Sequence, residues 1–169
     1  MTVDSRTDAI IFTDGSCIGS GGLCPGGYAA LILMGSSEMV IRGRSLATTN
    51  TAMELHGVIS ALEALPPLIP ATIYTDSQYV VTGATERLPW WRSRRWRIVK
   101  GGKLANKDLW QRLSLLMDDH PISWRWIKGH AGNARNEQVH QWAYMEAQKA
   151  AAAKDSHRSN TPFQGVEAI

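Results

Sequence analysis

Residues 11–16 read Ile-Phe-Thr-Asp-Gly-Ser, and residues 73–78 read Ile-Tyr-Thr-Asp-Ser-Gln. In both stretches a short run of β-branched and aromatic residues leads into Thr-Asp and then into small polar residues, which is typical of a strand that ends in a turn. A right-handed crossover between them would place the two strands side by side and parallel. We therefore expect Asp14 and Asp76 at the same end of one sheet, where open α/β sheets bind ligands.

The rest of the chain supplies the other elements of an α/β domain. Strands are predicted at 9–13, 28–34, 39–43, 72–75 and 122–127. Helical spacing of apolar residues predicts helices at 52–65, 77–85, 106–117 and 136–154. The first three strands form an antiparallel meander that contains a Gly-rich loop at 19–27 and a hairpin at Gly35-Ser36-Ser37. The sequence thus predicts one domain, residues 1–154, with a mixed sheet flanked by helices, and a partly disordered C-terminal tail at 155–169.

Glu54 adds a third carboxylate near the same sheet edge, because it begins the helix that precedes the second Thr-Asp strand. Three converging carboxylates repel each other unless a cation lies between them, and hard divalent cations such as Mg²⁺ prefer oxygen ligands. Each residue also has a purely structural explanation. An Asp after a strand is often a turn former, and Thr51-Ala52-Met53-Glu54 fits a helix capping box. The residues alone leave both interpretations open.

The formal net charge of +3 over 169 residues hides an uneven distribution. Eight basic residues and no acidic residue lie between Arg87 and Lys107, whereas the remaining residues carry 10 basic and 15 acidic side chains, a formal sum of −5. This basic segment (87–107) also contains Trp90, Trp91 and Trp96. It is either a solvated surface or a contact for a polyanion, with cations that neutralise phosphates and aromatic rings that stack on sugars or bases.

Composition excludes several classes of protein. A hydrophobic content of 44% and a charged content of 20% are ordinary for a globular protein and argue against intrinsic disorder. No apolar run approaches the roughly 18 residues of a membrane span, and the first ten residues contain charges that a secretory signal would not. Cys17 and Cys24 are expected to be reduced thiols of a cytoplasmic protein.

Five motifs, in this order and spacing, resemble bacterial ribonuclease H of type 1: residues 12–28, 48–55, 75–80, 106–112 and 127–132. The resemblance covers about residues 9–150 and includes the basic segment, which in that family is a protrusion that holds the substrate. It implies a five-stranded mixed sheet flanked by helices. It also implies endonucleolytic hydrolysis of the RNA strand of an RNA–DNA hybrid, assisted by two Mg²⁺ ions.

The resemblance also implies roles for individual residues. Asp14 would bridge both ions, with Glu54 and Asp76 as further ligands, and His130 would shuttle a proton or aid product release. The implied substrate contacts are Gly15, Ser16, Cys17, Thr49, Asn50, Gln78, Trp91, Arg92, Arg94, Arg95, Trp96 and Lys100. Because phosphate contacts carry no base information, cleavage is expected to be largely independent of sequence.

Within this set, the contacts divide between the two strands of the hybrid. Asn50, Gln78 and the backbone of residues 15–17 would read the minor groove, which displays the 2′-hydroxyls of RNA. Thr49 would hold a phosphate of the DNA strand. Trp91 is expected to reach the DNA strand, and Trp96 is expected to be its buried support.

One position departs from the family pattern. The family has an Asp at the start of the last helix, and the matching residue in this chain is His140. We consider that His140 replaces the carboxylate as a metal ligand or positions the attacking water, with a metal preference shifted toward Mn²⁺, since imidazole nitrogen suits softer ions better than Mg²⁺. Alternatively His140 is a spectator and activity is low, or Glu137 supplies the carboxylate instead.

Three functions therefore remain open at this stage. The first is a metal-dependent hybrid ribonuclease, acting as a monomer. The second is a protein that binds hybrids but has impaired catalysis, as the His140 substitution suggests. The third is another nuclease with the same core, such as an integrase or a resolvase, which the basic segment and the His130 loop disfavour.

Overall fold

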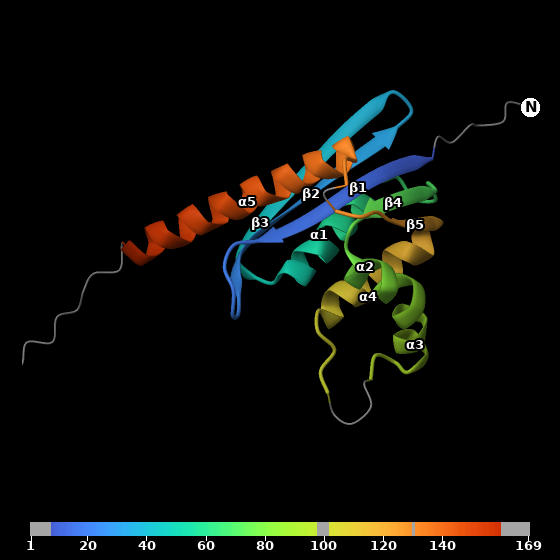
Figure 1. The fold of residues 1–169 in the computed structure, drawn as a ribbon. Helices are drawn as coiled ribbons and strands as arrows, with labels where there is room; N and C mark the ends of the chain where they lie inside the picture. The colour runs from blue at the N-terminus through green and yellow to red at the C-terminus, as the bar shows by residue number, and fades with distance from the viewer. Residues whose placement is uncertain (1–7, 98–101, 130, 160–169) are drawn as a thin grey trace, which may run out of the picture.

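A five-stranded sheet with the strand order β3-β2-β1-β4-β5 forms the centre of the protein (Figure 1). The structure is a computed structural model that describes residues 8–97, 102–129 and 131–159. The central strand, β1 (Ala9–Cys17), pairs antiparallel with β2 (Cys24–Met34) and parallel with β4 (Ala71–Thr75). The expected mixed sheet is confirmed, and so is the parallel pairing of the two strands that end in Thr-Asp.

The hairpin of β2 and β3 (Ser37–Thr48) is longer than the sequence pattern indicated. Its two strands pair from Met34 and Ser37 at the turn to Cys24 and Thr48 at the far end. The predicted Gly-rich loop is correspondingly shorter, because β2 already begins at Cys24. Glycines at the start of β2 therefore belong to the sheet and not to a loop.

The first helix, α1 (Asn50–Glu63), begins two residues earlier than expected. Its N-cap is Thr49, whose hydroxyl accepts a hydrogen bond from the backbone N–H of Ala52 at 3.2 Å. The predicted capping box that starts at Thr51 is therefore wrong. Glu54 lies more than one turn inside the helix, where it has no capping function, and its carboxylate is available for another purpose.

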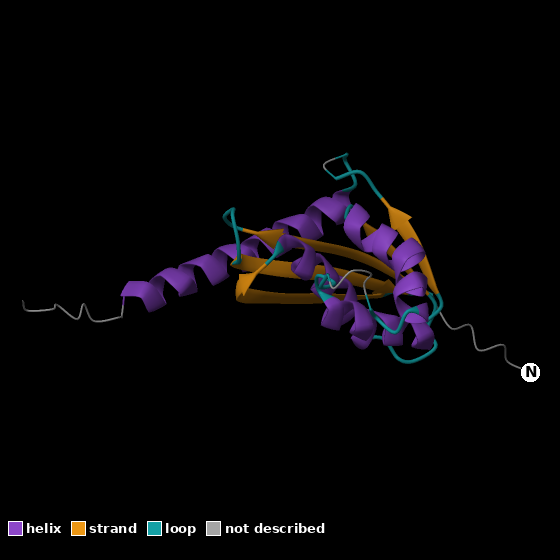
Figure 2. Cartoon of the chain, turned by 90° about the horizontal axis from the view of Figure 1, so that it is seen from below, coloured by secondary structure: helices purple, strands orange, loops and turns teal. Residues whose placement is uncertain are grey.

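Each face of the sheet is covered by helices (Figure 2). Alternate side chains of β1 point to opposite faces of the sheet. Ile11 belongs to the core between the sheet and α1. Phe12 belongs to the core between the sheet and α5 (Ala134–Ser159), together with Val139 and Ala143. This alternation is the period of two expected for a strand buried on both faces. β1 is therefore a rigid base for the residues at its carboxyl end.

A run of helical segments follows β4 and extends into the basic segment. It consists of α2 (Gln78–Thr82), a π-helical turn η1 (Gly83–Arg87) and α3 (Leu88–Ser93). It packs on α4 (Lys107–Asp119), whose Trp110 is fully buried. The predicted helix at 77–85 is thus the start of a longer helical run.

The last strand, β5 (Ile122–Trp126), pairs parallel with β4 at the edge of the sheet. The predicted strand at 122–127 is confirmed, and Trp126 at its end is 46% exposed. Helix α5 continues to Ser159, so the first five residues of the predicted tail are helical, and residues 160–169 lie outside the described residues. None of the helices in the described ranges is long and apolar enough to span a membrane.

Candidate functional site

Three carboxylates meet at the carboxyl ends of β1 and β4. Asp14 belongs to β1, Asp76 directly follows β4, and Glu54 comes from α1. One oxygen of each side chain lies within 4.8 Å of the oxygens of the other two. The convergence expected from the two Thr-Asp strands and the following helix is therefore present.

Gly15 allows α1 to approach β1 closely enough to bring Glu54 into this cluster. A Cβ atom at residue 15 would lie 2.3 Å from the backbone nitrogen of Glu54, a distance that no side chain tolerates. The backbone N–H of Gly15 also donates a hydrogen bond to Asp14 Oδ1 at 2.8 Å. The glycine after the first Asp is therefore required by the packing of strand and helix and also holds the Asp14 carboxylate.

The carboxylate cluster is short of positive charge. The pKa of Asp14 is raised from 3.8 to about 6, first by burial and then by the charge of Asp76, against the hydrogen bonds from His140 and Gly15 that lower it. The pKa of Glu54 is raised well above its ordinary value, first by burial and then by the charges of Asp14 and Asp76. A bound cation would reverse both effects by favouring the ionised carboxylates.

An unpartnered buried oxygen also points to a cation in the cluster. Glu54 Oε2 is buried and accepts no hydrogen bond from the described residues. Burying such an oxygen without a partner costs about 1–3 kcal/mol or more. Three carboxylates with a spare buried oxygen suit a hard divalent cation, which prefers oxygen ligands. The residues present therefore fit a magnesium or manganese site.

His140, in α5, contacts the cluster through Asp14. Its Nδ1 lies 2.6 Å from Asp14 Oδ2, and because an ionised carboxylate can only accept, the ring N–H donates. The His140 side chain is 39% exposed, whereas that of Asp14 is 4% exposed. Among the described residues, the set with metal-ligand spacing contains neither His140 nor Glu137. His140 is thus next to the cluster without being part of it.

The loop after β5 passes beside Asp76. A Cβ atom at Gly129 would lie 2.6 Å from Asp76 Oδ2, so the backbone of residue 129 touches the carboxylate. His130 itself lies outside the described residues. The resemblance implied a role for this loop through His130, and within the described residues Gly129 brings the loop next to Asp76.

The residues expected to read the minor groove, and Thr49, which is expected to hold a DNA phosphate, belong to the elements that carry the cluster or directly follow it. Asn50 is exposed at the first turn of α1, Gln78 is exposed at the first turn of α2, and Thr49 is half-buried at the N-cap of α1. Residues 15–17 form the end of β1. Thr49 and Asn50 thus begin the helix that carries Glu54, and Gln78 follows Asp76 by two residues.

Cys17 and Cys24 are both free thiols, as expected. Burial, followed by a hydrogen bond with Cys24, raises the pKa of the Cys17 thiol to about 12. A thiol with so high a pKa supplies almost no thiolate at neutral pH and is a poor nucleophile. A catalytic role for Cys17 through its sulfur therefore has no support, and its backbone remains the expected contact.

Asn106 connects two helices through side-chain hydrogen bonds that the sequence did not indicate. It adopts a left-handed conformation (φ 56°) at the N-cap of α4 and donates hydrogen bonds from Nδ2 to Thr51 Oγ1 and Tyr79 Oη, both at 3.1 Å. Trp110 Nε1–H donates to the same Tyr79 oxygen at 3.0 Å. The network ties the start of α4, which follows the basic segment, to the first turn of α1. The only local signal is an Asn directly before a helix.

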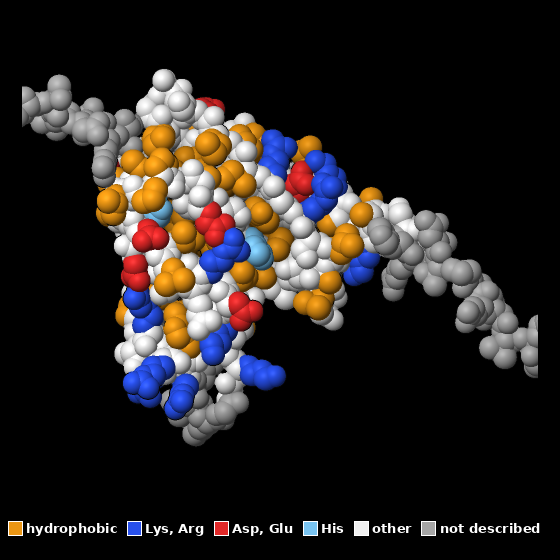
Figure 3. Space-filling view, turned by 180° about the vertical axis from the view of Figure 1, so that it is seen from behind, with side chains coloured by type: hydrophobic (Ala, Val, Ile, Leu, Met, Phe, Trp, Pro, Cys, Tyr) orange, Lys and Arg blue, Asp and Glu red, His pale blue; other side chains and the backbone are white. Residues whose placement is uncertain are grey.

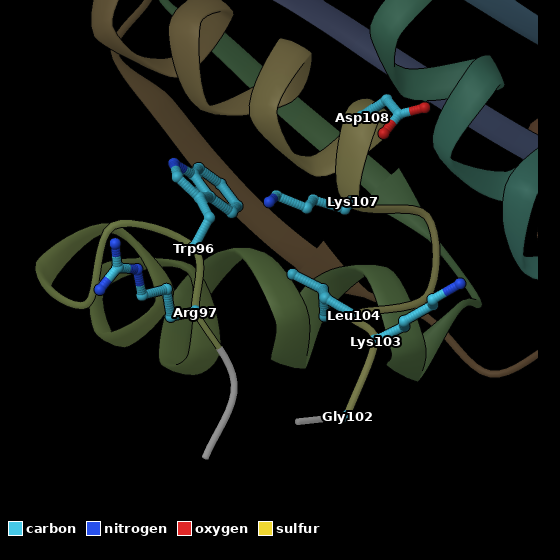
Figure 4. A pocket seen from close by; sticks show the side chains of 7 residues that line it. All are labelled: Trp96, Arg97, Gly102, Lys103, Leu104, Lys107 and Asp108. Atoms are coloured by element: carbon cyan, nitrogen blue, oxygen red, sulfur yellow. The ribbon is translucent and has the colours of Figure 1, made fainter. Parts of the chain in front are cut away.

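Lys and Arg side chains gather at the end of the molecule that carries α3 and the start of α4 (Figure 3). A cavity of about 510 Å³ opens there (Figure 4). Its lining residues are Trp96, Arg97, Gly102, Lys103, Leu104, Lys107 and Asp108. The Lys107 side chain extends toward the ring of Trp96, so this cavity combines an aromatic face with cations.

The expected burial of the two tryptophans is reversed. Trp91 is only 7% exposed, because its ring packs 5.2 Å from that of Trp110, centroid to centroid. Trp96 is half-buried and lies 6.4 Å from Trp91. Trp91 is therefore the support of the basic segment, and Trp96 is the ring that reaches the surface.

The cations expected to bind phosphate differ in what they contact. Arg92 makes two hydrogen bonds with the exposed Asp118, at 2.7 and 2.9 Å, so its guanidinium is committed to an ion pair. Arg94 stacks over the ring of Trp90 at 4.6 Å. Arg95 is exposed, and Lys100 lies outside the described residues. Arg92 is therefore a weaker candidate for a phosphate contact than Arg94 or Arg95.

Comparisons with known sequences all find similarity to ribonuclease H. A family model described as RNase H matches residues 6–148. A Ribonuclease H of Caulobacter sp. (strain K31) is 41% identical over 150 residues, which are 89% of this chain and 96% of that protein. A Ribonuclease H of Polynucleobacter asymbioticus is 45% identical over 133 residues, which are 79% of this chain and 85% of that protein.

Solved structures show a similar fold. The crystal structure of LC9-RNase H1, described as a type 1 RNase H with the type 2 active-site motif, has a TM-score of 0.79 and 29% sequence identity, and the match covers 88% of this chain and 76% of that chain. LC11-RNase H1, solved in complex with an RNA/DNA hybrid, has a TM-score of 0.62 and 17% sequence identity. The match covers 85% of this chain and 99% of that chain. At that identity the second likeness concerns the fold alone.

Proposed function

Because this chain belongs to the ribonuclease H family, we propose that it is an endonuclease that hydrolyses the RNA strand of RNA–DNA hybrids with the help of two divalent metal ions. The observation that carries the proposal is the buried cluster of Asp14, Glu54 and Asp76 at the carboxyl ends of β1 and β4. Cleavage would be largely independent of base sequence, since the expected contacts are to sugars and phosphates.

The three carboxylates would hold the ions. Two Mg²⁺ ions bound there would activate a water and stabilise the leaving 3′ oxygen. Asp14 would be shared between them, with Glu54 and Asp76 as further ligands. The raised pKa values of Asp14 and Glu54 and the unpartnered Glu54 Oε2 support this role, because each is relieved when a cation is bound.

The residues around the cluster would hold the hybrid. Asn50, Gln78 and the backbone at the end of β1 belong to the elements that carry the carboxylates or directly follow them, and they would contact the minor groove, where the 2′-hydroxyls distinguish RNA from DNA. The cations of the basic segment would neutralise phosphates beyond the active site. Since all of these residues come from one chain, we propose that the protein acts as a monomer.

His140 would occupy the fourth position of the active site, and experiment can compare a ligand role with a role in orienting Asp14. In the first, a ring nitrogen would be a ligand of a metal ion, with a preference shifted toward Mn²⁺. In the second, Nδ1–H continues to donate to Asp14 Oδ2, as the distance of 2.6 Å favours, and orients that carboxylate toward the ions. The two roles require different groups at this position, a nitrogen ligand or an N–H donor, so variants distinguish them.

A second candidate function is hybrid binding with impaired catalysis, which the replacement of a carboxylate by His140 favours. One assay separates the candidates: labelled RNA–DNA hybrid, duplex DNA and duplex RNA are incubated with the protein in Mg²⁺, Mn²⁺ or EDTA. We expect cleavage of the RNA strand of the hybrid alone, lost in EDTA. Binding of the hybrid without cleavage would support the second candidate, and cleavage of duplex DNA would support an integrase-like or resolvase-like nuclease.

Replacement of two cations of the basic segment tests how the hybrid is held. We expect Arg94→Gln/Arg95→Gln to raise KM for the hybrid about tenfold at low salt and to reduce the slope of log KM against log salt by about 1–2, with kcat little changed. KM is measured from 50 to 200 mM KCl.

A matched control is available for this prediction. The guanidinium of Arg112 is paired with Glu63 between α4 and α1, away from the basic segment. Arg112→Gln should therefore leave the salt slope unchanged. A double variant that keeps the wild-type slope would show that Arg94 and Arg95 do not contact phosphates.

A further inference from the structure

Trp126 is the large side chain whose surroundings the proposed function leaves unexplained. It ends β5, at the edge of the sheet, and its side chain is 46% exposed. An indole that is nearly half exposed contributes less to the core than a buried one. Its single polar atom makes a specific contact, because Nε1–H donates a hydrogen bond to the backbone oxygen of Asp76 at 3.0 Å.

That contact is one of several that fix the backbone on either side of Asp76. The N–H of Ile127 donates to the backbone oxygen of Thr75 at 3.0 Å, and the N–H of Ser77 donates to Thr75 Oγ1 at 3.1 Å. Asp76 lies between the last paired residue of β4 and the N-cap of α2, Ser77. Trp126 therefore holds the main-chain oxygen of the residue that links the end of β4 to the start of α2.

The chain that follows Trp126 contacts the same residue again. Gly129 lies so close that a Cβ atom there would be 2.6 Å from Asp76 Oδ2. The end of β5 and the following loop therefore touch Asp76 at two points, the main-chain oxygen through Trp126 and the carboxylate through Gly129. Neither residue belongs to the carboxylate cluster.

We propose that Trp126 is a positioning residue, whose indole N–H fixes the main chain of Asp76 so that its carboxylate faces Asp14 and Glu54 and binds metal. The inference rests on the proposed metal-dependent function. Groups that orient metal ligands in this way typically affect metal affinity 10–100-fold. Gly129 acts with Trp126, because it leaves the space that the Asp76 carboxylate occupies.

Trp124 supplies a matched control on the same strand. It lies two residues before Trp126 and so on the same face of β5, and its Nε1 is buried with no hydrogen-bond partner among the described residues. Trp124→Phe and Trp126→Phe both remove an indole N–H from β5. Only the second removes a hydrogen bond to Asp76.

The test is titration of the metal-free proteins with Mn²⁺, by electron paramagnetic resonance and by the rise in Tm that binding produces. We expect Trp126→Phe to bind Mn²⁺ about tenfold more weakly than wild type, Trp124→Phe to bind like wild type, and both to have similar metal-free Tm values. Gly129→Ala, which displaces the carboxylate directly, should also bind more weakly. In cleavage assays, Trp126→Phe should need more metal for half-maximal rate without a change in KM for the hybrid.

Each other outcome has a definite meaning. If Trp126→Phe binds Mn²⁺ like wild type, or if Trp124→Phe is weakened as much, the positioning role is wrong. A raised KM for the hybrid with normal Mn²⁺ binding would instead make Trp126 a substrate contact and would also overturn the proposal. Failure of the wild-type protein to bind Mn²⁺ would contradict the proposed function itself, so the two failures are distinguishable.

Discussion

Asp14→Asn should abolish cleavage of the RNA strand and at the same time make the metal-free protein more stable. Cleavage should fall at least about 1,000-fold, because the substitution removes the carboxylate that the two ions would share. The metal-free protein should gain on the order of 2 kcal/mol of unfolding free energy, because a pKa raised from 3.8 to about 6 reports a buried charge that destabilises the fold. Asparagine keeps the size of the side chain and can still accept from His140.

The dependence on pH tests the electrostatic cause. A carboxyl group whose pKa is raised on folding binds more protons in the folded state, so its contribution to stability falls as pH rises from 3.8 through about 6. The advantage of Asp14→Asn over wild type should therefore be absent near pH 4 and complete above pH 6. Urea unfolding in EDTA at pH 4, 5, 6 and 7.5 measures it.

Asp118→Asn is the matched control for this prediction. Asp118 is an exposed carboxylate whose pKa is lowered by its hydrogen bonds with Arg92. Its ionised form therefore stabilises the fold, whereas the ionised form of Asp14 destabilises it. Its replacement should give no gain in stability at neutral pH. If Asp14→Asn is no more stable than wild type at pH 7.5 in EDTA, the carboxylates of the cluster do not repel each other as argued.

The carboxylate cluster was predictable because its signals are local. A strand that ends in Thr-Asp can be identified from its own residues, and the rule for parallel crossovers then places Asp14 and Asp76 together. The cap of α1 was not predictable in the same way. Thr49 and Thr51 can both cap a helix, but the Thr51 hydroxyl accepts from Asn106 of a distant helix, and Thr49 takes the cap.

The predicted burial of the tryptophans was wrong for a related reason. Trp91 and Trp96 look equivalent in sequence, and only Trp110, from another helix, decides that Trp91 is the buried one. In β5, likewise, Trp126 stays 46% exposed while its Nε1–H donates to the backbone oxygen of Asp76. Burial of these rings depends on contacts between segments far apart in the chain, which no local pattern records.

Substitutions of His140 should separate its two roles and have the largest effect on metal preference. His140→Asp would place a fourth carboxylate beside Asp14. We expect it to bind Mg²⁺ at least about tenfold more tightly and to raise the Mg²⁺-supported rate, because carboxylate oxygen suits this ion better than imidazole nitrogen. Its metal-free form should be less stable than wild type, since a hydrogen-bond donor to Asp14 is replaced by a second negative charge.

His140→Asn and His140→Ala distinguish a ligand from a positioning residue. The amide of Asn can donate to Asp14 Oδ2 much as Nδ1–H does, but it is a poor metal ligand. If His140 orients Asp14, the Asn variant should keep most of the wild-type rate with both ions, and the Ala variant should lose about tenfold. If His140 binds metal, both variants should lose activity, and wild type should work better with Mn²⁺ than with Mg²⁺.

The measurement is the rate of hybrid cleavage at increasing Mg²⁺ and at increasing Mn²⁺ for the wild type and the three variants, with Mn²⁺ binding to the metal-free proteins as a second reading. The structure favours the positioning role, because the distance of 2.6 Å commits Nδ1 to Asp14 and the carboxylates with metal-ligand spacing exclude His140. An Ala variant that matches wild type with both ions would contradict the ligand role and the positioning role together. It would leave His140 a spectator, and the three carboxylates would then be sufficient for the reaction.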